Sequence, residues 1–213
     1  EEPQDLEVNA STLRERLIEA VQLRFLRSDV PVGAYLSGGI DSAITAAVIA
    51  KYTDAPLRTF SLRFADFDFD EGPFQEAMAR RLGTEHEQIV VHASDIGANF
   101  PEVVRHSETP ILRAAPAPMF LLSGLVRDSG YKVVVTGEGA DEVFAGYDLF
   151  REARLREFLA RNPESELRSR ALGLLYPWMP RSPGQAPAFA REFFGRNLDL
   201  TDPAQSHRPR WDS

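Results

Sequence analysis

Two segments of this chain each join a short apolar strand pattern to a glycine-rich loop. Residues 32–36 lead into Ser37-Gly38-Gly39-Ile40-Asp41-Ser42, and residues 43–51 then have the composition of a buried helix. Residues 132–136, which include three consecutive valines, lead into the second loop at Gly137. Continuous apolar runs are typical of strands buried on both faces of a parallel sheet, and ligands bind beyond the carboxyl ends of such strands. The pattern predicts an open α/β sheet whose two loops face one crevice.

The first loop has the composition of a phosphate-binding site. Adjacent glycines let the backbone turn sharply and approach a ligand, while the following helix offers unpaired N–H donors at its positive dipole end. No lysine follows Gly39, so the spacing differs from that of a Walker loop. Phosphate charge would then be met by hydroxyls, N–H groups and a Mg²⁺ ion held by Asp41. The alternative is a Ser/Gly turn that only caps a helix.

The second loop carries two acidic residues, Glu138 and Asp141. If the loops share a crevice, these carboxylates approach Asp41, and three carboxylates beside a triphosphate require a cation or a proton among them. This requirement again indicates Mg²⁺. The alternative is that the acidic residues only complement the dipole of a helix that begins there.

Together the two loops resemble known signatures. The first resembles the SGGxDS motif of the N-type ATP pyrophosphatases, and the pair resembles the synthetase domain of asparagine synthetase, whose second signature is SGEGxDE; Thr136 stands here at the serine position. The segments Phe60-Ser61-Leu62 and Leu82-Gly83-Thr84-Glu85-His86 also resemble that family. The specific resemblance extends over about residues 28–150.

The resemblance implies a ligase that uses ATP and Mg²⁺ in asparagine biosynthesis. A carboxylate, expected to be the aspartate side chain, would attack the α-phosphate and release pyrophosphate, and ammonia would then attack the acyl-adenylate. The implied catalytic residues are Asp41, Glu138 and Asp141, with Asp41 and Asp141 holding the metal. The implied ATP and pyrophosphate contacts are Leu36, Ser37, Gly38, Gly39, Asp41, Ser42, Leu62, Thr136 and Gly137, and Arg113 is a candidate for the substrate carboxylate.

Other functions stay open at this stage. A β-lactam synthetase adenylates a carboxylate but closes a ring, and that family resembles this motif with a tyrosine where Glu138 stands. A related amidotransferase of secondary metabolism could act on another acid. An inactive ATP-binding fragment or binding module would keep the loop without the chemistry.

Composition restricts the partners. The chain has 24 Lys and Arg against 32 Asp and Glu, so its net charge is −8 and a nucleic-acid partner is disfavoured. With no cysteine it has no disulfide and no thiolate site, and it has no apolar stretch long enough to span a membrane. We expect a cytoplasmic protein that acts on small molecules, and a homodimer is open.

Parts of the resembling enzyme are not matched here. The cysteine-dependent glutaminase domain, a domain or subunit expected to supply ammonia, has no counterpart, and neither Lys51 nor Lys132 resembles the family's lysine downstream of the second signature. Arg181 could replace that lysine in charge but not in geometry. We therefore expect a fragment that also lacks the C-terminal part of the synthetase domain and is poorly active alone.

The predicted fold is α/β: a doubly wound, mainly parallel sheet flanked by helices, as in PP-loop ATPases of the adenine nucleotide alpha hydrolase type, with a helical C-terminal appendage. The predicted domains are a synthetase core over 1–150 and an appendage with an irregular tail over 151–213. The capping-box spacing of Thr12 and Glu15 predicts a helix beginning there. The acidic residues 66–71 are expected to form a solvated loop anchored by Phe67 and Phe69. None of the four histidines, including His207, has metal-ligand spacing.

Overall fold

The computed structural model describes residues 6–177, 179 and 182–202. The chain forms two compact units, residues 1–138 and residues 139–213. The domain boundary predicted after residue 150 stays a prediction, and each compact unit is described separately below.

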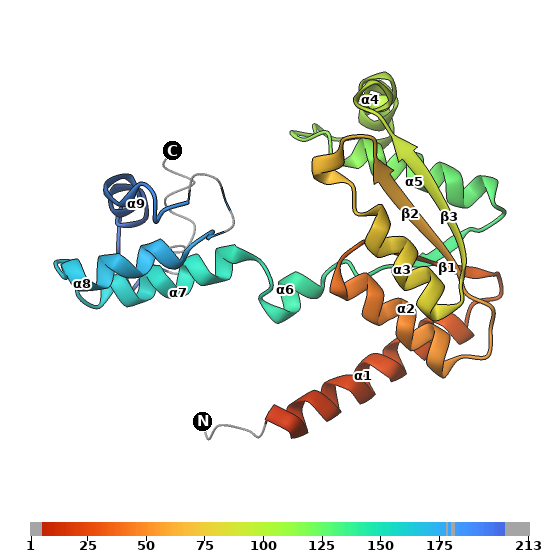
Figure 1. Ribbon diagram of the computed structural model, residues 1–213, viewed down its shortest axis with the longest axis horizontal. Helices are drawn as coiled ribbons and strands as arrows, with labels where there is room; N and C mark the ends of the chain where they lie inside the picture. The colour runs from red at the N-terminus through yellow and green to blue at the C-terminus, as the bar shows by residue number, and fades with distance from the viewer. Residues whose placement is uncertain (1–5, 178, 180–181, 203–213) are drawn as a thin grey trace. The chain divides into compact units, whose positions relative to one another are not determined.

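A four-stranded parallel sheet forms the centre of the first unit. Its strands are β1 (Val32–Tyr35), β2 (Arg58–Phe64), β3 (Glu85–Val91) and β4 (Val133–Val135). Their order is β3-β2-β1-β4, and Ala34 on β1 is paired both with Thr59 on β2 and with Val135 on β4. Figure 1 labels β1, β2 and β3 within this sheet. The predicted parallel sheet is therefore confirmed, and the direction in which successive strands are added reverses between β1 and β4. The burial predicted for the strand at residues 132–136 is wrong, because β4 is the last strand in this order, Val133 is exposed, and Val134 and Val135 are half-buried.

Helices cover both faces of this sheet, as a doubly wound fold requires. On one face lie α1 (Leu6–Leu26), α2 (Ile40–Tyr52) and α3 (Gly72–Leu82), which share a core with β1. On the other face α5 (Pro116–Asp128) packs on β2 and β3, and α4 (Ala93–Ser107) packs on α5. The alternation of strand residues serves both cores: Ala34 and Leu36 belong to the first, and Phe60 belongs to the second.

The first helix begins earlier than its capping signal predicts. It starts by Leu6, and the Thr12 hydroxyl donates to the Val8 carbonyl oxygen four residues back, at 2.9 Å. A threonine within a helix can bond to the preceding turn instead of capping a new one. The predicted start at Thr12 is therefore wrong, although a helix is present before the first strand and shares a core with the sheet.

The acidic segment after β2 is anchored by charge and not by its aromatic rings. In a short 3-10 turn (Phe67–Phe69), Phe67 is 91% exposed, so its predicted anchoring role is wrong, and Phe69 is 68% exposed with an edge contact to the Phe64 ring. Asp70 instead accepts two hydrogen bonds from the Arg63 guanidinium, of which the one from Nε measures 3.0 Å. A bidentate ion pair of this kind fixes the segment without apolar burial.

The second unit is helical. It contains α6 (Ala140–Phe144), α7 (Asp148–Ala160), α8 (Glu166–Ser169), the 3-10 turn η2 (Arg170–Leu174) and α9 (Pro187–Phe194). Its core consists of Leu159, Leu172, Leu175, Ala190 and Phe194. The predicted irregular tail is therefore wrong for residues 187–194, because Ala190 and Phe194 lie one turn apart and are both buried.

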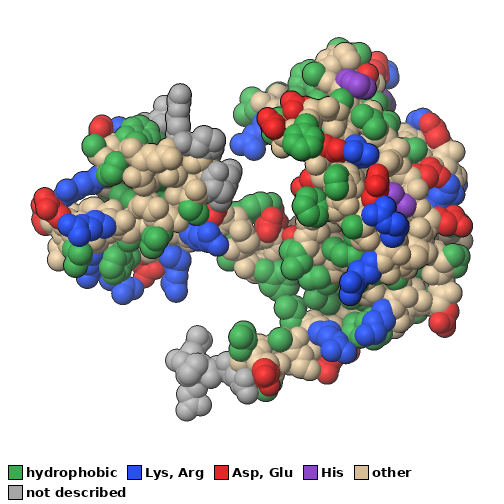
Figure 2. Space-filling view, in the orientation of Figure 1, with side chains coloured by type: hydrophobic (Ala, Val, Ile, Leu, Met, Phe, Trp, Pro, Cys, Tyr) green, Lys and Arg blue, Asp and Glu red, His purple; other side chains and the backbone are tan. Residues whose placement is uncertain are grey.

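Two properties of the described residues bear on partners. No helix among residues 6–177, 179 and 182–202 combines the length and apolarity that crossing a membrane requires. Figure 2 shows Lys and Arg side chains interspersed with Asp and Glu side chains over the displayed face.

Candidate functional site

The first glycine loop connects β1 to α2 and is closed by two serines. The Ser37 N–H donates to the Ser42 hydroxyl at 3.0 Å, and the two hydroxyl oxygens lie 2.8 Å apart. The Gly39 N–H donates to the Ser37 hydroxyl at 3.1 Å. Ser42 is only 6% exposed, whereas residues 37–40 are exposed. The loop thus has a fixed inner side and an outer edge that solvent reaches.

The second glycine loop begins against the first. Because β4 is paired with β1 and parallel to it, both loops leave the sheet from the same edge. A Cβ atom added to Gly137 would lie 2.7 Å from the Ser42 backbone nitrogen and 3.0 Å from the Asp41 Cβ. Only glycine allows this approach. The structure therefore brings Gly137 together with Asp41 and Ser42 at the position where the strand order reverses, between β1 and β4.

Thr136 and Glu138 flank this contact. Thr136 is half-buried, and its hydroxyl accepts a hydrogen bond from the Glu138 N–H at 3.3 Å. The Glu138 side chain is exposed, so its carboxylate is accessible to a ligand. The hydroxyl expected at this position is therefore used to shape the loop.

Asp141 lies in the second unit, in the first turn of α6. A Cβ atom on Gly146 would lie 2.0 Å from one Asp141 carboxylate oxygen, and the Gly146 N–H donates to the Asp141 carbonyl at 3.0 Å. The glycine that follows α6 thus makes room for this carboxylate. The meeting of Asp41 with Asp141 stays a prediction, because the two residues belong to different compact units.

The remaining predicted residues occupy varied positions. Leu36 is buried and donates its N–H to the Phe60 carbonyl at 2.9 Å, and Leu62 packs beside Phe60 on the α5 face. Arg113 is exposed in the connection between α4 and α5. Arg181 and His207 lie outside the described residues.

Glu71 is a residue at this site that sequence reasoning missed. One of its carboxylate oxygens accepts a hydrogen bond from the Gly38 N–H at 2.9 Å. This N–H is one of the donors expected to hold phosphate, so a carboxylate of this chain occupies an anion position of the loop. Residues 66–71 were predicted to be a solvated loop, and no local signal showed that Glu71 at its end lies over the first glycine loop.

Ionic contacts position the segment that carries Glu71. The Arg63 guanidinium holds the pKa of the Asp70 carboxyl below its ordinary value, and Asp70 in turn raises the pKa of Arg63. Asp70 also accepts the Gly72 N–H at 3.1 Å. Nearby on β3, burial lowers the pKa of His86, whose Nδ1 lies 2.9 Å from the Thr59 hydroxyl.

The carboxylates fit a metal that is shared with a nucleotide. The described residues contain no group of three or more His, Cys, Asp or Glu side chains that could hold a metal ion by themselves. Mg²⁺ usually binds through one or two carboxylates together with phosphate oxygens, and the partly exposed Asp41 beside the loop can supply one.

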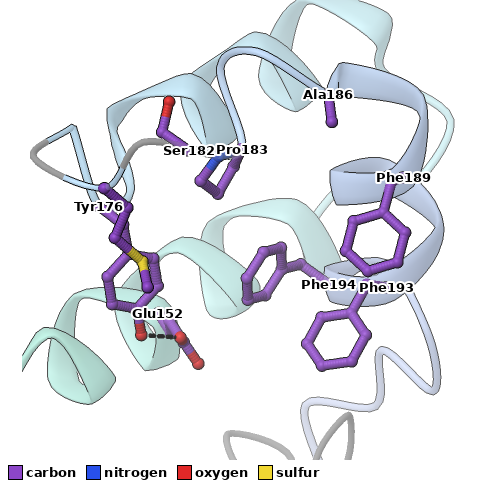
Figure 3. A pocket seen from close by; sticks show the side chains of 9 residues that line it. Glu152, Tyr176, Ser182, Pro183, Ala186, Phe189, Phe193 and Phe194 are labelled. Carbon is purple, nitrogen blue, oxygen red and sulfur yellow. Dashed lines mark hydrogen bonds between the residues drawn. The ribbon is translucent and has the colours of Figure 1, made fainter.

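The second unit contains a separate pocket of about 290 Å³. Figure 3 shows Phe189, Phe193 and Phe194 on one side and Glu152 with Tyr176 on the other. Glu152 is 1% exposed and accepts a hydrogen bond from the Tyr176 hydroxyl. Within the described part of the chain, none of the predicted site residues lines this pocket.

A buried arginine links the helices beside that pocket. Arg156 on α7 donates to the carbonyl oxygens of Phe194 and Arg196, at 2.9 Å for the latter. Burial lowers the pKa of Arg156, and the charge of Glu152 opposes that shift. The hydrogen bonds of Arg156 connect α7 to the end of α9, so Arg156 and the neighbouring Glu152 have a structural role.

The fold and the two loops define a class: an α/β protein in which two glycine loops meet where the strand order of a parallel sheet reverses. Residues 12–211 match the family described as asparagine synthase. The chain therefore belongs to the asparagine synthase family.

Named relatives agree with this assignment. Amidase chyE from Penicillium rubens is 37% identical over 162 residues, which cover 68% of this chain and 24% of the relative. Asparagine synthetase [glutamine-hydrolyzing] 1 from Bacillus subtilis is 35% identical over 140 residues, covering 66% and 22%. The chain thus spans about a quarter of the length of the curated relatives it matches.

Among solved structures, the NH3-dependent NAD synthetase from Campylobacter jejuni aligns with a TM-score of 0.48 and 16% sequence identity. The alignment covers 94% of this chain and 91% of that one.

Proposed function

We propose that this chain is the nucleotide-binding part of an ATP-dependent, amide-forming synthetase. A substrate carboxylate oxygen attacks the α-phosphorus of ATP, the bond to the bridging oxygen of the β-phosphate breaks, and pyrophosphate leaves. Ammonia then attacks the acyl carbon of the adenylate, loses a proton, and AMP departs with its electron pair. The aspartate side chain is the proposed carboxylate.

The contact of Gly137 with Asp41 and Ser42 carries this proposal. It places the second loop on the first at the reversal point of the sheet, where open α/β sheets bind ligands. Membership in the asparagine synthase family supports the choice of reaction.

The first loop is proposed to hold the leaving pyrophosphate. Gly38 and Gly39 are exposed residues, and their N–H groups, with the hydroxyls of Ser37 and Ser42, are the proposed donors to the phosphates. Donors in fixed positions stabilise charge that develops on a leaving group. Asp41 and Asp141 are proposed to hold Mg²⁺, which would neutralise part of that charge. Asp141 follows Gly137 by four positions in the sequence, so their Cα atoms lie within about 14 Å of each other.

The second loop is proposed to handle the acyl-adenylate. The exposed Glu138 carboxylate is the candidate base that takes the proton from the attacking ammonia. Leu36, Leu62, Thr136 and Gly137 are proposed to border the adenosine, and Arg113 to contact the substrate carboxylate. A glutaminase domain or subunit is the proposed source of ammonia, as the name of the Bacillus subtilis relative suggests.

A second candidate is amide formation on a different carboxylic acid. The relative from Penicillium rubens is named an amidase and is 37% identical over 162 residues, so the family includes members not named for asparagine. The two candidates share the adenylation step and differ only in the acid.

An isotope-transfer assay tests the proposal. With carboxyl-¹⁸O-labelled aspartate, Mg-ATP and ammonia, adenylation joins one ¹⁸O atom to the α-phosphorus, and the attack of ammonia on the acyl carbon releases that atom in AMP, which mass spectrometry detects. We expect slow but measurable transfer, at least about tenfold lower in Glu138→Gln because the base is lost. Glu85→Gln, at the exposed start of β3, is the matched control and should behave as wild type.

Binding provides an independent arm of the same test. Mg-ATP should raise the unfolding midpoint of the wild-type chain by mass action, and Asp41→Asn should reduce that rise while the exposed control Asp54→Asn should not. Stabilisation by ATP without isotope transfer from any acid would support a binding module and contradict the synthetase.

A further inference from the structure

Glu71 occupies a position in the first loop that a phosphate oxygen would need. Its carboxylate accepts the Gly38 N–H at 2.9 Å, and a Cβ atom on Gly38 would lie 2.9 Å from the Glu71 Cβ and 3.1 Å from the carboxylate oxygen. The glycine therefore permits the close approach of this acidic side chain. Both residues are exposed, so the contact can open without uncovering apolar surface.

The contact is supported by a braced segment. Asp70, next to Glu71, is held by the Arg63 guanidinium and by the Gly72 N–H. Arg63 also contacts Glu76 at 3.4 Å, and a Cβ atom on Gly72 would lie 2.1 Å from Arg63 Nε. Gln75, which is 2% exposed, donates to the Leu62 carbonyl at 3.0 Å and fixes α3 against β2. The backbone of Glu71 is thus fixed over the loop while its side chain stays exposed.

The charge balance of the loop makes this carboxylate consequential. Between residues 37 and 42 the loop contains Asp41 and no basic residue, so Glu71 adds a second negative charge where a triphosphate would bind. A metal-free triphosphate is repelled by both carboxylates, whereas bound Mg²⁺ lowers the triphosphate charge by two and attracts them.

We propose that Glu71 is a specificity-determining residue that makes the loop select metal-bound over metal-free nucleotide. In the absence of ligand its carboxylate accepts the hydrogen bond of the Gly38 N–H, and the phosphates displace it when nucleotide binds. When no metal accompanies the phosphates, repulsion by the carboxylate lowers the affinity of the loop for them. This inference rests on the proposed function, because it requires the first loop to bind a nucleotide.

Calorimetric titration of the 213-residue chain tests the selectivity directly. ATP affinity is measured with excess Mg²⁺ and again with a chelator, and the ratio of the two dissociation constants is compared between proteins. In Glu71→Gln, metal-free ATP should bind at least about fivefold more tightly while Mg-ATP affinity changes less than about twofold. Asp68→Asn removes the same charge from an exposed residue of the same acidic segment and should leave the ratio unchanged.

The Gly38 amide resonance reports the contact without any nucleotide. Glu71→Gln should move the Gly38 amide proton upfield because a carboxylate is the stronger acceptor, and Asp68→Asn should not. Titration of the wild type with Mg-ATP should shift the same resonance as phosphate replaces the carboxylate.

The outcomes separate the two proposals. Suppose that the wild type binds Mg-ATP but Glu71→Gln has the wild-type ratio of dissociation constants, or that the Gly38 amide proton does not shift in Glu71→Gln. The role of Glu71 is then overturned, and the proposed function stands. If the wild type binds neither form of ATP, the proposed function is overturned and the role of Glu71 with it.

Discussion

The two glycine loops of this protein are shaped by different physical means. The first, after β1, is closed by hydrogen bonds between the side chains and backbone of Ser37 and Ser42. The second, after β4, is shaped by missing side chains, because Gly137 lies against the Ser42 backbone and Gly146 against the Asp141 carboxylate. One loop depends on groups that are present, and the other depends on space that is left empty.

This difference predicts different responses to substitution. Loss of a hydroxyl removes a hydrogen bond that water can partly replace, whereas an added methyl group overlaps atoms that must move. When those atoms belong to the backbone, as at Gly137, a rotamer change cannot relieve the overlap. When they belong to a side chain, as at Gly146, it can.

The largest effect is expected from Gly137→Ala. Its methyl group would lie 2.7 Å from the Ser42 nitrogen, so the loops must separate, at a cost of about 2 kcal/mol in the free energy of unfolding. Mg-ATP affinity should fall at least about tenfold. Urea unfolding and calorimetry measure both quantities. Gly124→Ala, in α5 with open space around it, should be neutral or slightly stabilising. Equal behaviour of the two variants would contradict the proposed loop contact.

A smaller effect is expected from Ser42→Ala. The Ser37 N–H and hydroxyl lose their partner, which should lower the free energy of unfolding by about 1 kcal/mol. Urea unfolding measures the change, and Ser94→Ala on the exposed side of α4 is its control. A loss as large as that of Gly137→Ala would show that the two loops do not differ in the way described above.

Gly146→Ala should change stability by less than about 1 kcal/mol, because the Asp141 side chain can turn away from the new methyl group. Turning would remove a proposed metal ligand, so the Mg²⁺ dependence of ATP affinity should weaken about threefold or more. Calorimetry at several Mg²⁺ concentrations measures this dependence. An unchanged dependence would argue against Asp141 as a metal ligand.

The smallest effect is expected from the pH dependence of the Arg63–Asp70 ion pair, which supports the segment beside the first loop. Arg63 lowers the pKa of Asp70 in the folded state, so below about pH 4 the unfolded chain binds more protons at this residue than the folded chain does. The stability that Asp70 contributes is complete above that pH and is lost as the pH falls. The difference in urea midpoint between wild type and Asp70→Asn should therefore narrow from pH 5 to pH 3. A constant difference would show that the ion pair does not stabilise the fold.

The sequence predicted the strands of the sheet better than the helices that follow them in the chain. The strands at residues 32–36 and 132–136 have strong apolar patterns, and the helix that ends before Gly83 carries a clear stop signal, with Gly83 in the left-handed region at φ 66°. No helix was predicted over residues 93–107, where α4 lies; its Pro101 and Gly97 obscure the helical period. The burial of α9 was missed among prolines, although Pro187 suits the first turn of a helix.

The candidate site was predicted in part for the same reason. Residues that lie close together in the sequence, such as Ser37 and Ser42, can be recognised as one motif. Glu71 lies 33 residues from Gly38, and only the packing of α3 beside β2 brings their atoms into contact. Local patterns contain no information on such a distant pairing.

The sequence by itself determined that a glycine loop follows each of two apolar strands and that these loops carry hydroxyls and carboxylates. Strand burial and backbone turning are local properties, which residue type and spacing fix. Only the tertiary structure decided that Gly137 lies on Ser42 and that Glu71 occupies the Gly38 N–H. These contacts depend on strand order and helix packing, which are set when the first unit buries the apolar clusters on the two faces of its sheet.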